Sequence, residues 1–240
     1  MALNGSGTIS IGGSTTGQSI NLELGRSATA ASNLGETALR TLAGVASGTI
    51  SMSNFYGKSN FTPTTRTYSV FQSAATSGVE TVPTGATSVV IEVWGGGGYG
   101  GTPYFDGTDY FSAGGGGGGA YSKSTYSVSG GQTLNYSAGG YGVSTGNSTV
   151  TSGTKTITSM AANRGGNGSD GTFGTPGSPG GGGGASGGTD TNTTGNSGSG
   201  STGGAARTGL SSSAYGAGGG GDTIGTYTVG GQGAVIFRYT

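Results

Sequence analysis

The 240-residue sequence contains no cysteine and no histidine. Disulfide bonds, thiol nucleophiles, zinc sites built on cysteine or histidine, and histidine acid–base chemistry are therefore excluded. Charged residues are also scarce, and nine basic residues balance nine acidic ones to a formal net charge of zero. This balance argues against binding to nucleic acid and against electrostatic binding to a membrane, because both need a basic surface.

Aliphatic and aromatic core formers are scarce as well. Leucine, isoleucine, valine and phenylalanine together account for 35 residues, fewer than an ordinary globular core contains. No run of 18 apolar residues is present, so we expect no transmembrane helix. The opening residues "MALNGSGTIS" lack a basic region and an apolar stretch, so we expect no signal peptide.

Glycine is plentiful instead, and 48 of the 60 glycines follow Trp94. The longest run is Gly114–Gly119, and shorter runs stand at 95–98, 180–184 and 218–221. A change of composition near residue 60 comes before this glycine. We therefore predict two parts, a small N-terminal module over residues 1–60 and a glycine-rich β domain over residues 61–240.

The N-terminal part is expected to be a small α+β module. The alternation in 8–12 and 19–25 predicts two short strands, and 48–59 predicts a third. Residues 32–45 predict a helix with Asn33 as N-cap, Leu34, Ala38 and Leu42 on one face, and Gly44 at its end. This module has too few apolar residues for a stable core of its own, so we expect contacts with a partner or with further copies of the chain to stabilise it.

Beyond residue 60 the patterns predict β-structure. Segment 88–94 alternates, with Val89, Ile91 and Val93 on one face and Val90, Glu92 and Trp94 on the other. Segments 66–73, 120–140, 154–166 and 232–240 are also strand-like, and 120–140 contains two strands around a Gly-Gly turn. Core-facing strands at both ends of this region favour a β-sandwich with glycine-rich insertions.

The glycine runs are expected to form polyproline-II-like helices. Such a helix has three residues per turn and no internal hydrogen bonds. Without side chains, neighbouring helices can approach closely and satisfy each other's backbone groups without a hydrophobic core. A flexible linker is the alternative for 186–204, which is rich in glycine, serine and threonine.

Two stretches of the sequence resemble bacteriophage tail proteins. The segment "INLELG…LGETALRTLAGVASGTISMSNFYGKS" is similar to the N-terminal segment of many tail-associated structural proteins. The segments "TVPTGATSVVIEVWGGGGYGG", "GGGGGGAYSKSTYSVSGG" and "GQGAVIFRY" resemble the glycine-rich domain of phage tail-fibre and adhesin proteins. This resemblance implies a polyglycine-II bundle whose loops bind receptors on the host surface. A related domain occurs in a receptor tyrosine kinase family, so the domain alone does not imply a viral origin.

One loop of the glycine-rich region is crowded with aromatic and acidic residues. Its candidate receptor-binding residues are Tyr99, Tyr104, Phe105, Asp106, Asp109, Tyr110 and Phe111. Loops on a rigid scaffold are frequent binding sites, and aromatic faces can stack on sugars. Alternatively, the rings pack over the glycine segments or against a sister subunit. The two aspartates also allow a calcium site or a glycosidase pair, although "DGTD" is too short to coordinate calcium alone.

Three further sets of residues are weaker candidates. Secondary loops at 169–179 and 205–217 carry Phe173, Arg207, Leu210 and Tyr215, and ordinary turns are the alternative for both. Phe55 and Tyr56 are candidates for attachment to a virion partner, or else they form the core of the N-terminal module.

The sequence therefore favours a phage tail fibre or adhesin that recognises a host-surface glycan or outer-membrane protein. The alternative is a purely architectural virion protein of the neck, baseplate or capsid. A depolymerase would need clustered acids, whereas most of the nine acidic residues are scattered singly, so we expect no enzyme activity. We expect no cofactor and no metal, no nucleic acid partner and no membrane insertion. Expected partners are other virion proteins and further copies of the chain, as a homotrimer on an external appendage of the virion.

Overall fold

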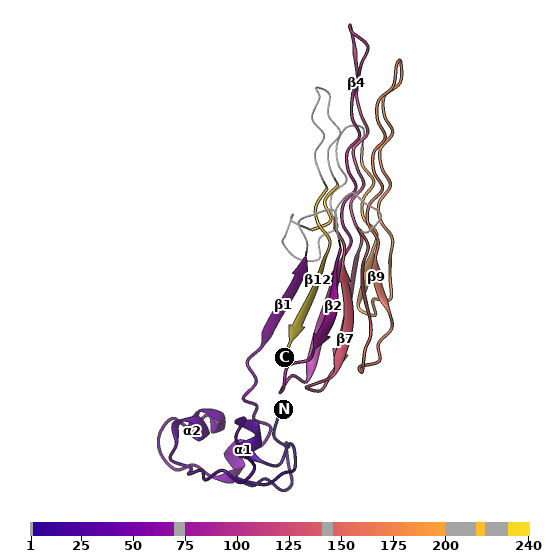
Figure 1. Ribbon diagram of the computed structural model, residues 1–240. Helices are drawn as coiled ribbons and strands as arrows, with labels where there is room; N and C mark the ends of the chain where they lie inside the picture. The colour runs from indigo at the N-terminus through magenta and orange to yellow at the C-terminus, as the bar shows by residue number, and fades with distance from the viewer. Residues whose placement is uncertain (1, 70–74, 141–145, 200–214, 219–229) are drawn as a thin grey trace.

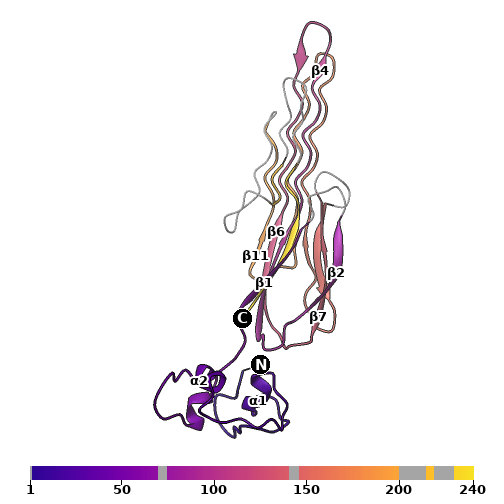
Figure 2. The same cartoon turned by 60° about the vertical axis from the view of Figure 1, so that its left-hand side comes forward.

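The computed structural model describes residues 2–69, 75–140, 146–199, 215–218 and 230–240. The molecule is elongated, with a small N-terminal module at one end and two β-sheets in the middle (Figure 1). Long extended segments run on from the sheets to the opposite end, where strand β4 (Tyr104–Phe105) lies. The view turned by 60° shows the same order along the long axis (Figure 2).

The middle of the molecule is a sandwich of two antiparallel five-stranded sheets. In the first sheet the order is β1 (Thr64–Ser69), β12 (Ala234–Tyr239), β3 (Ser88–Trp94), β6 (Tyr121–Ser127) and β11 (Thr191–Thr193). In the second it is β10 (Ala185–Ser186), β9 (Met160–Ala162), β8 (Ser148–Ser152), β7 (Thr133–Ala138) and β2 (Thr76–Thr81). The expectation of a mainly β protein with a sandwich is confirmed.

The core of the sandwich follows the alternation of its strands. Val89, Ile91 and Val93 of β3 are fully buried, as are Val235 and Phe237 of the neighbouring β12. Residues of the second sheet complete the same cluster, namely Leu134, Ala138, Val150, Met160 and Ala162. Alternate residues point to opposite faces of a strand, and the predicted grouping of Val89, Ile91 and Val93 on one face is confirmed.

A buried carboxylate links the two sheets. Glu80 lies on β2 and is 1% exposed. Its carboxylate accepts hydrogen bonds from the hydroxyls of Tyr68 (2.6 Å) and Tyr239 (2.8 Å) and from Arg66 Nη1 (2.9 Å), which all belong to the other sheet. These three donors satisfy the hydrogen-bonding needs of the buried carboxylate. Because the donors and the acceptor come from different sheets, the bonds fix how the two sheets face each other.

The N-terminal module differs from its predicted secondary structure. Residues 19–25 were predicted to be a strand but contain helix α1 (Ile20–Glu23), and the predicted strand segment 48–59 contains the 3₁₀ helix η1 (Met52–Phe55). Segment 8–12 contributes only an isolated bridge between Ser10 and Ser19. Short apolar runs do not distinguish a strand from a helical turn by period alone, which explains these errors.

The predicted helix of this module is present but shorter. Helix α2 (Thr37–Ala43) ends at Gly44, which has a left-handed φ of 73° as expected for a C-cap. Its N-cap is Glu36 rather than Asn33, because Asn33 forms a turn before the helix and accepts a bond from the amide of Gly35. The buried face holds Leu39, Leu42 and Ala43, so the prediction that Ala38 faces the core was wrong.

Two expectations for the sandwich also need correction. The strands β6 and β7 were predicted around the turn at Gly130–Gly131, but they belong to different sheets, so this turn crosses the sandwich and makes no hairpin. Within 154–166 only β9 (Met160–Ala162) is a strand, and β8 was not foreseen. A pattern of residues identifies strands but does not say which sheet each one joins.

Beyond the strands, seven extended segments form what we call the glycine bundle. Its described segments are residues 95–103, 112–120, 163–171, 176–184, 194–199, 215–218 and 230–233. Segment 112–120 forms backbone hydrogen bonds with five of the others. A β-strand bonds to two neighbours at most, so this arrangement is a three-dimensional bundle and not a sheet.

The hydrogen bonds of the bundle repeat every third residue. The amides of Gly95, Gly98 and Gly101 donate to the carbonyls of Ala120, Gly117 and Gly114 at 2.8–2.9 Å. The amides of Gly165, Gly168 and Gly171 donate in the same way to Gly96, Tyr99 and Thr102 at 2.8–2.9 Å. Segment 194–199 takes part through Gly195 and Gly198, and β11 lies just before it, so the linker interpretation of 186–204 is wrong for its described residues.

The bundle explains why the sequence needs so much glycine. A Cβ atom at Gly117 would lie 2.0 Å from the carbonyl oxygen of Gly181, and one at Gly101 would lie 2.1 Å from that of Ser169. Distances this short are impossible for a carbon atom against a backbone oxygen. The segments can therefore hydrogen-bond at this spacing only where side chains are absent.

Candidate functional site

The aromatic loop predicted from the sequence forms the end of the molecule farthest from the N-terminal module (Figures 1 and 2). It is a hairpin of β4 (Tyr104–Phe105) and β5 (Tyr110–Phe111), with Tyr104 opposite Phe111 and Phe105 opposite Tyr110. Successive residues of a strand point to opposite faces. The hairpin therefore carries one aromatic pair on each face.

A neighbouring loop adds a fifth ring to this end. Residues 172–175 form a tight turn in which Thr172 and Thr175 exchange two backbone hydrogen bonds of 2.9 Å. The ring of Phe173 in this turn lies 6.0 Å from that of Phe111, centroid to centroid. We call residues 104–111 and 172–175 together the distal tip. The structure thus brings Phe173, a secondary candidate, together with the main aromatic loop.

The rings of the distal tip are ordered against one another and open to solvent. Phe105 and Tyr110 are stacked, with centroids 4.4 Å apart and an interplanar angle of 28°. Tyr104 and Phe111 on the other face lie 6.2 Å apart. Four of the five rings are among the most exposed large apolar side chains of the described residues: Tyr104, Phe105, Tyr110 and Phe173. The alternative that these rings pack over the glycine segments is therefore wrong for these four within one chain.

The turn of the hairpin is held by Asp106. Its carboxylate oxygen Oδ1 accepts hydrogen bonds from the amides of Thr108 (2.8 Å) and Asp109 (2.7 Å). These amides lower the pKa of Asp106 below its usual range, so it stays ionised at neutral pH. Gly107 between them has a φ of 102°, a conformation that suits glycine. Asp106 therefore acts on the shape of the loop.

The glycine bundle supports the distal tip from below. The amide of Gly101 donates to Gly114 across the base of the hairpin (2.8 Å). The amide of Thr102 donates to the carboxylate of Asp170 (2.6 Å), and the amide of Gly171 donates back to the carbonyl of Thr102 (2.9 Å). Both loops of the tip are thus tied to the same backbone network, which fixes their relative position.

The remaining loop candidates lie elsewhere. Tyr99 is half-buried within the bundle, where its amide donates to Asn167 Oδ1 and its carbonyl accepts from Gly168. Tyr215 packs against Trp94 on the outer face of the first sheet, with centroids 6.4 Å apart. Arg207 and Leu210 lie outside the described residues.

The two aromatic residues considered for attachment have different environments. Phe55 is fully buried in the core of the N-terminal module with Leu3, Ile20 and Leu39. Of the two interpretations for Phe55, the structure supports the core. Tyr56 is exposed, and its hydroxyl donates to the carbonyl of Gly7 (2.6 Å). Only Tyr56 is therefore available for contact with another molecule.

The arrangement of acids does not favour calcium or glycoside hydrolysis. Within the described residues, no three potential ligands from aspartate, glutamate, histidine and cysteine are grouped closely enough to hold a metal ion. Asp106 and Asp109 are both exposed, and the amides of the turn lower the pKa of Asp106, which is the opposite of what a general acid needs. No helix in the described part of the chain is long and apolar enough to cross a membrane.

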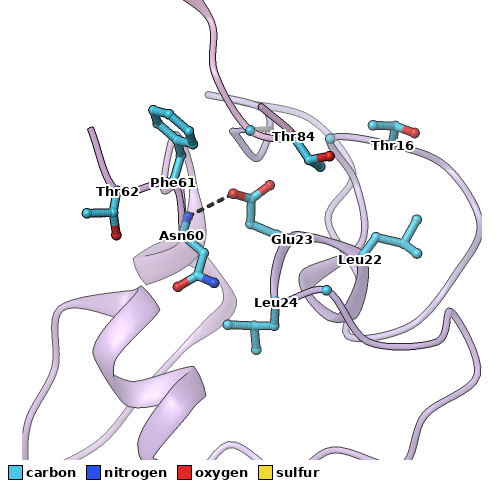
Figure 3. A pocket seen from close by; sticks show the side chains of 11 residues that line it. Thr16, Leu22, Glu23, Leu24, Asn60, Phe61, Thr62 and Thr84 are labelled. Atoms are coloured by element: carbon cyan, nitrogen blue, oxygen red, sulfur yellow. Dashed lines mark hydrogen bonds between the residues drawn. The ribbon is translucent and has the colours of Figure 1, made fainter. Parts of the chain in front are cut away.

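A pocket that the sequence did not predict lies where the N-terminal module meets the sandwich (Figure 3). Its volume is about 630 Å³, and its lining includes Leu22, Glu23, Leu24, Asn60, Phe61 and Thr84. Glu23 Oε1 accepts hydrogen bonds from the amide of Asn60 (2.8 Å) and the hydroxyl of Ser59 (3.2 Å). The pocket therefore surrounds the joint between the two parts, and its residues are too far apart in the sequence to be recognised as a group.

Comparison with known proteins leaves the family open: no protein-family model matches the chain, and no curated protein matches it.

Proposed function

We propose that this protein is a bacteriophage tail fibre or adhesin, a structural protein of the virion that contacts the host surface through its distal tip. The observation that carries this proposal is the group of exposed aromatic rings at the end of an elongated molecule, opposite its N-terminal module. Contiguous exposed apolar surface on a soluble protein commonly marks an interaction site. The resemblance of the sequence to phage tail proteins supplies the biological setting.

The glycine bundle has the role of a rigid spacer in this proposal. We assign it a polyglycine-II-like structure, supported by hydrogen bonds that recur every third residue, the period of a polyproline-II helix. Backbone hydrogen bonds hold its segments together in place of a hydrophobic core. The bundle can therefore extend far from the sandwich with few apolar residues. Loops at its end can then vary in sequence without disturbing the support.

The N-terminal module is the proposed attachment part. It has its own buried cluster around Leu39 and Phe55, separate from that of the sandwich. Its apolar core is small, which suits a module that is completed by virion proteins or by further copies of the chain, such as a homotrimer. An exposed Tyr56 is a candidate contact for these partners.

Locating the protein on the particle tests this proposal against the architectural alternative. Antibodies raised against the distal hairpin and against the N-terminal module would be applied to intact virions and viewed by electron microscopy. We expect hairpin antibodies to label the outer end of a tail appendage. Label confined to the neck, baseplate or capsid would support a purely architectural protein, and unlabelled virions would contradict both.

A further inference from the structure

The area of the distal tip limits the kind of ligand that it can hold. Its four most exposed rings have exposed fractions of 41–74%. An aromatic side chain offers roughly 150–250 Å², so together these rings present about 400 Å² of apolar surface. A stable protein–protein interface needs about 800 Å² from each partner. Roughly 57% of such an interface is apolar, which is about 450 Å², so the rings match the apolar part of a small protein interface as well as the faces of one or two sugar rings. Their charge and arrangement decide between these two kinds of ligand.

The charges of the distal tip narrow the ligand further. Residues 104–111 and 172–175 include Asp106 and Asp109 and no lysine or arginine. An acidic sugar or a phosphate would meet negative charge with no cation to pair with it. Asp106 is already bonded to its own turn, whereas Asp109 is exposed and can accept a bond from a hydroxyl. The tip thus suits a neutral ligand with hydroxyl groups.

The ring pair of Phe105 and Tyr110 is prepared for stacking. Each ring is held by the other across the hairpin at 4.4 Å, and about half of each remains exposed. The face of an aromatic ring is electron-rich and attracts polarised C–H groups, such as those on one side of a pyranose. Little side-chain freedom is lost on binding, because the rings already restrain each other.

From these observations we propose that the distal tip binds neutral sugar rings of a host-surface polysaccharide, which stack on the Phe105–Tyr110 pair. The inference rests on the proposed function as an adhesin and specifies its ligand class. A single site of this size binds weakly, and several copies on one virion would raise the overall affinity, since linked sites act at high effective concentration.

The test uses the full-length protein, fluorescently labelled, on cells of the bacterium that the phage infects. Separate samples of cells are treated with periodate, which oxidises vicinal diols of sugars, or with proteinase K. We expect periodate to abolish binding and the protease to leave it unchanged. Loss of binding after protease alone would show a protein receptor and overturn this inference while leaving the adhesin proposal intact. No binding to untreated cells would contradict the adhesin proposal itself.

Substitutions of Phe105 and Tyr110 test whether their rings bind the ligand. Phe105→Ala and Tyr110→Ala are each expected to weaken binding about tenfold or more, as removal of a central aromatic anchor does. Tyr110→Phe keeps the ring and should bind almost as well as the wild type, and Val79→Ala, at an exposed site on the sandwich, is the control. Equal loss in Tyr110→Phe and Tyr110→Ala would contradict stacking as the mode of binding.

A competition assay tests whether the ligand is neutral or acidic. Neutral and acidic polysaccharide fractions purified from the same cells would compete with the cells for the labelled protein. We expect the neutral fraction to compete and the acidic fraction not to. Competition by the acidic fraction alone would overturn the assignment of a neutral ligand.

Discussion

At the scale of single residues, glycine is required at some positions of the bundle and replaceable at others. A Cβ at Gly180 would lie 2.0 Å from the carbonyl oxygen of Gly166, whereas one at the adjacent Gly181 would meet nothing within 4 Å. We expect Gly180→Ala to destabilise the protein by about 1–3 kcal/mol, the usual cost of overpacking. Gly181→Ala should be neutral or stabilising by up to about 1 kcal/mol, because alanine restricts the unfolded chain.

Denaturant unfolding of both variants measures this difference. Both substitutions add the same methyl group to the same glycine run, so propensity and composition are matched. Equal stability of Gly180→Ala and Gly181→Ala would contradict the close packing of the bundle.

A second prediction at this scale concerns the tyrosines that contact Glu80. Burial and the hydrogen bond to Glu80 raise the pKa of Tyr68 from 10.0 to about 12. Because the pKa is raised on folding, the stabilisation from Tyr68 is complete below pH 10 and is lost as the pH rises through about 12. We expect tyrosinate absorbance to show a late rise near pH 12, and Tyr68→Phe to reduce its amplitude by one tyrosine, because the pKa values of Tyr121 and Tyr239 are raised as well. A wild-type titration without such a late rise would show that Tyr68 is not buried against Glu80.

At the scale of elements, the sequence predicted best where one face of a strand is buried. The alternation in 88–94 grouped Val89, Ile91 and Val93 of β3, which pack together on a continuous apolar core. Segment 232–240 was expected to be a strand and contains β12. The alternation failed for α1 and η1, where four-residue helices are held by tertiary contacts such as that of Phe55. Pairing between sheets could not be predicted, since it depends on contacts between residues far apart in the chain.

The candidate site was predicted in part, for the same reason. The composition of 99–111 was enough to mark the aromatic loop, but not to show that Phe173 joins it or that Tyr99 does not lie at the tip. Those outcomes follow from the register of the glycine segments, which is set by backbone bonds such as that of Gly171 with Thr102. A run of glycines carries no side-chain pattern from which a register can be predicted.

The hairpin at the tip offers a prediction of its own. Asp106→Ala removes the acceptor for two amides of the turn, so the Phe105–Tyr110 pair should lose its fixed geometry and cell binding should weaken. Asp106→Asn retains an acceptor oxygen and is the matched control. Near-ultraviolet circular dichroism reports the ring pair, and unchanged spectra and binding in Asp106→Ala would show that the turn does not position the rings.

At the scale of the whole molecule, the N-terminal module and the sandwich have separate cores joined through residues 59–63. Phe55→Ala removes a fully buried ring of the module and is expected to cost about 3–5 kcal/mol there. Trp94 is the only tryptophan and lies in the sandwich, so its fluorescence reports the other part alone. We expect calorimetry to show a lowered transition for the module while the Trp94 transition stays in place. If both unfolding transitions moved to lower temperature together, the module and the sandwich would not have independent cores.

We propose that the distal tip contacts the host, and competition with phage for adsorption measures this contact. Host cells would be incubated with the purified protein, or with a Phe105→Ala/Tyr110→Ala double variant of equal stability, before phage is added. We predict that the wild-type protein blocks phage attachment and that the double variant does not. Equal blocking by both proteins, or by neither, would contradict the claim.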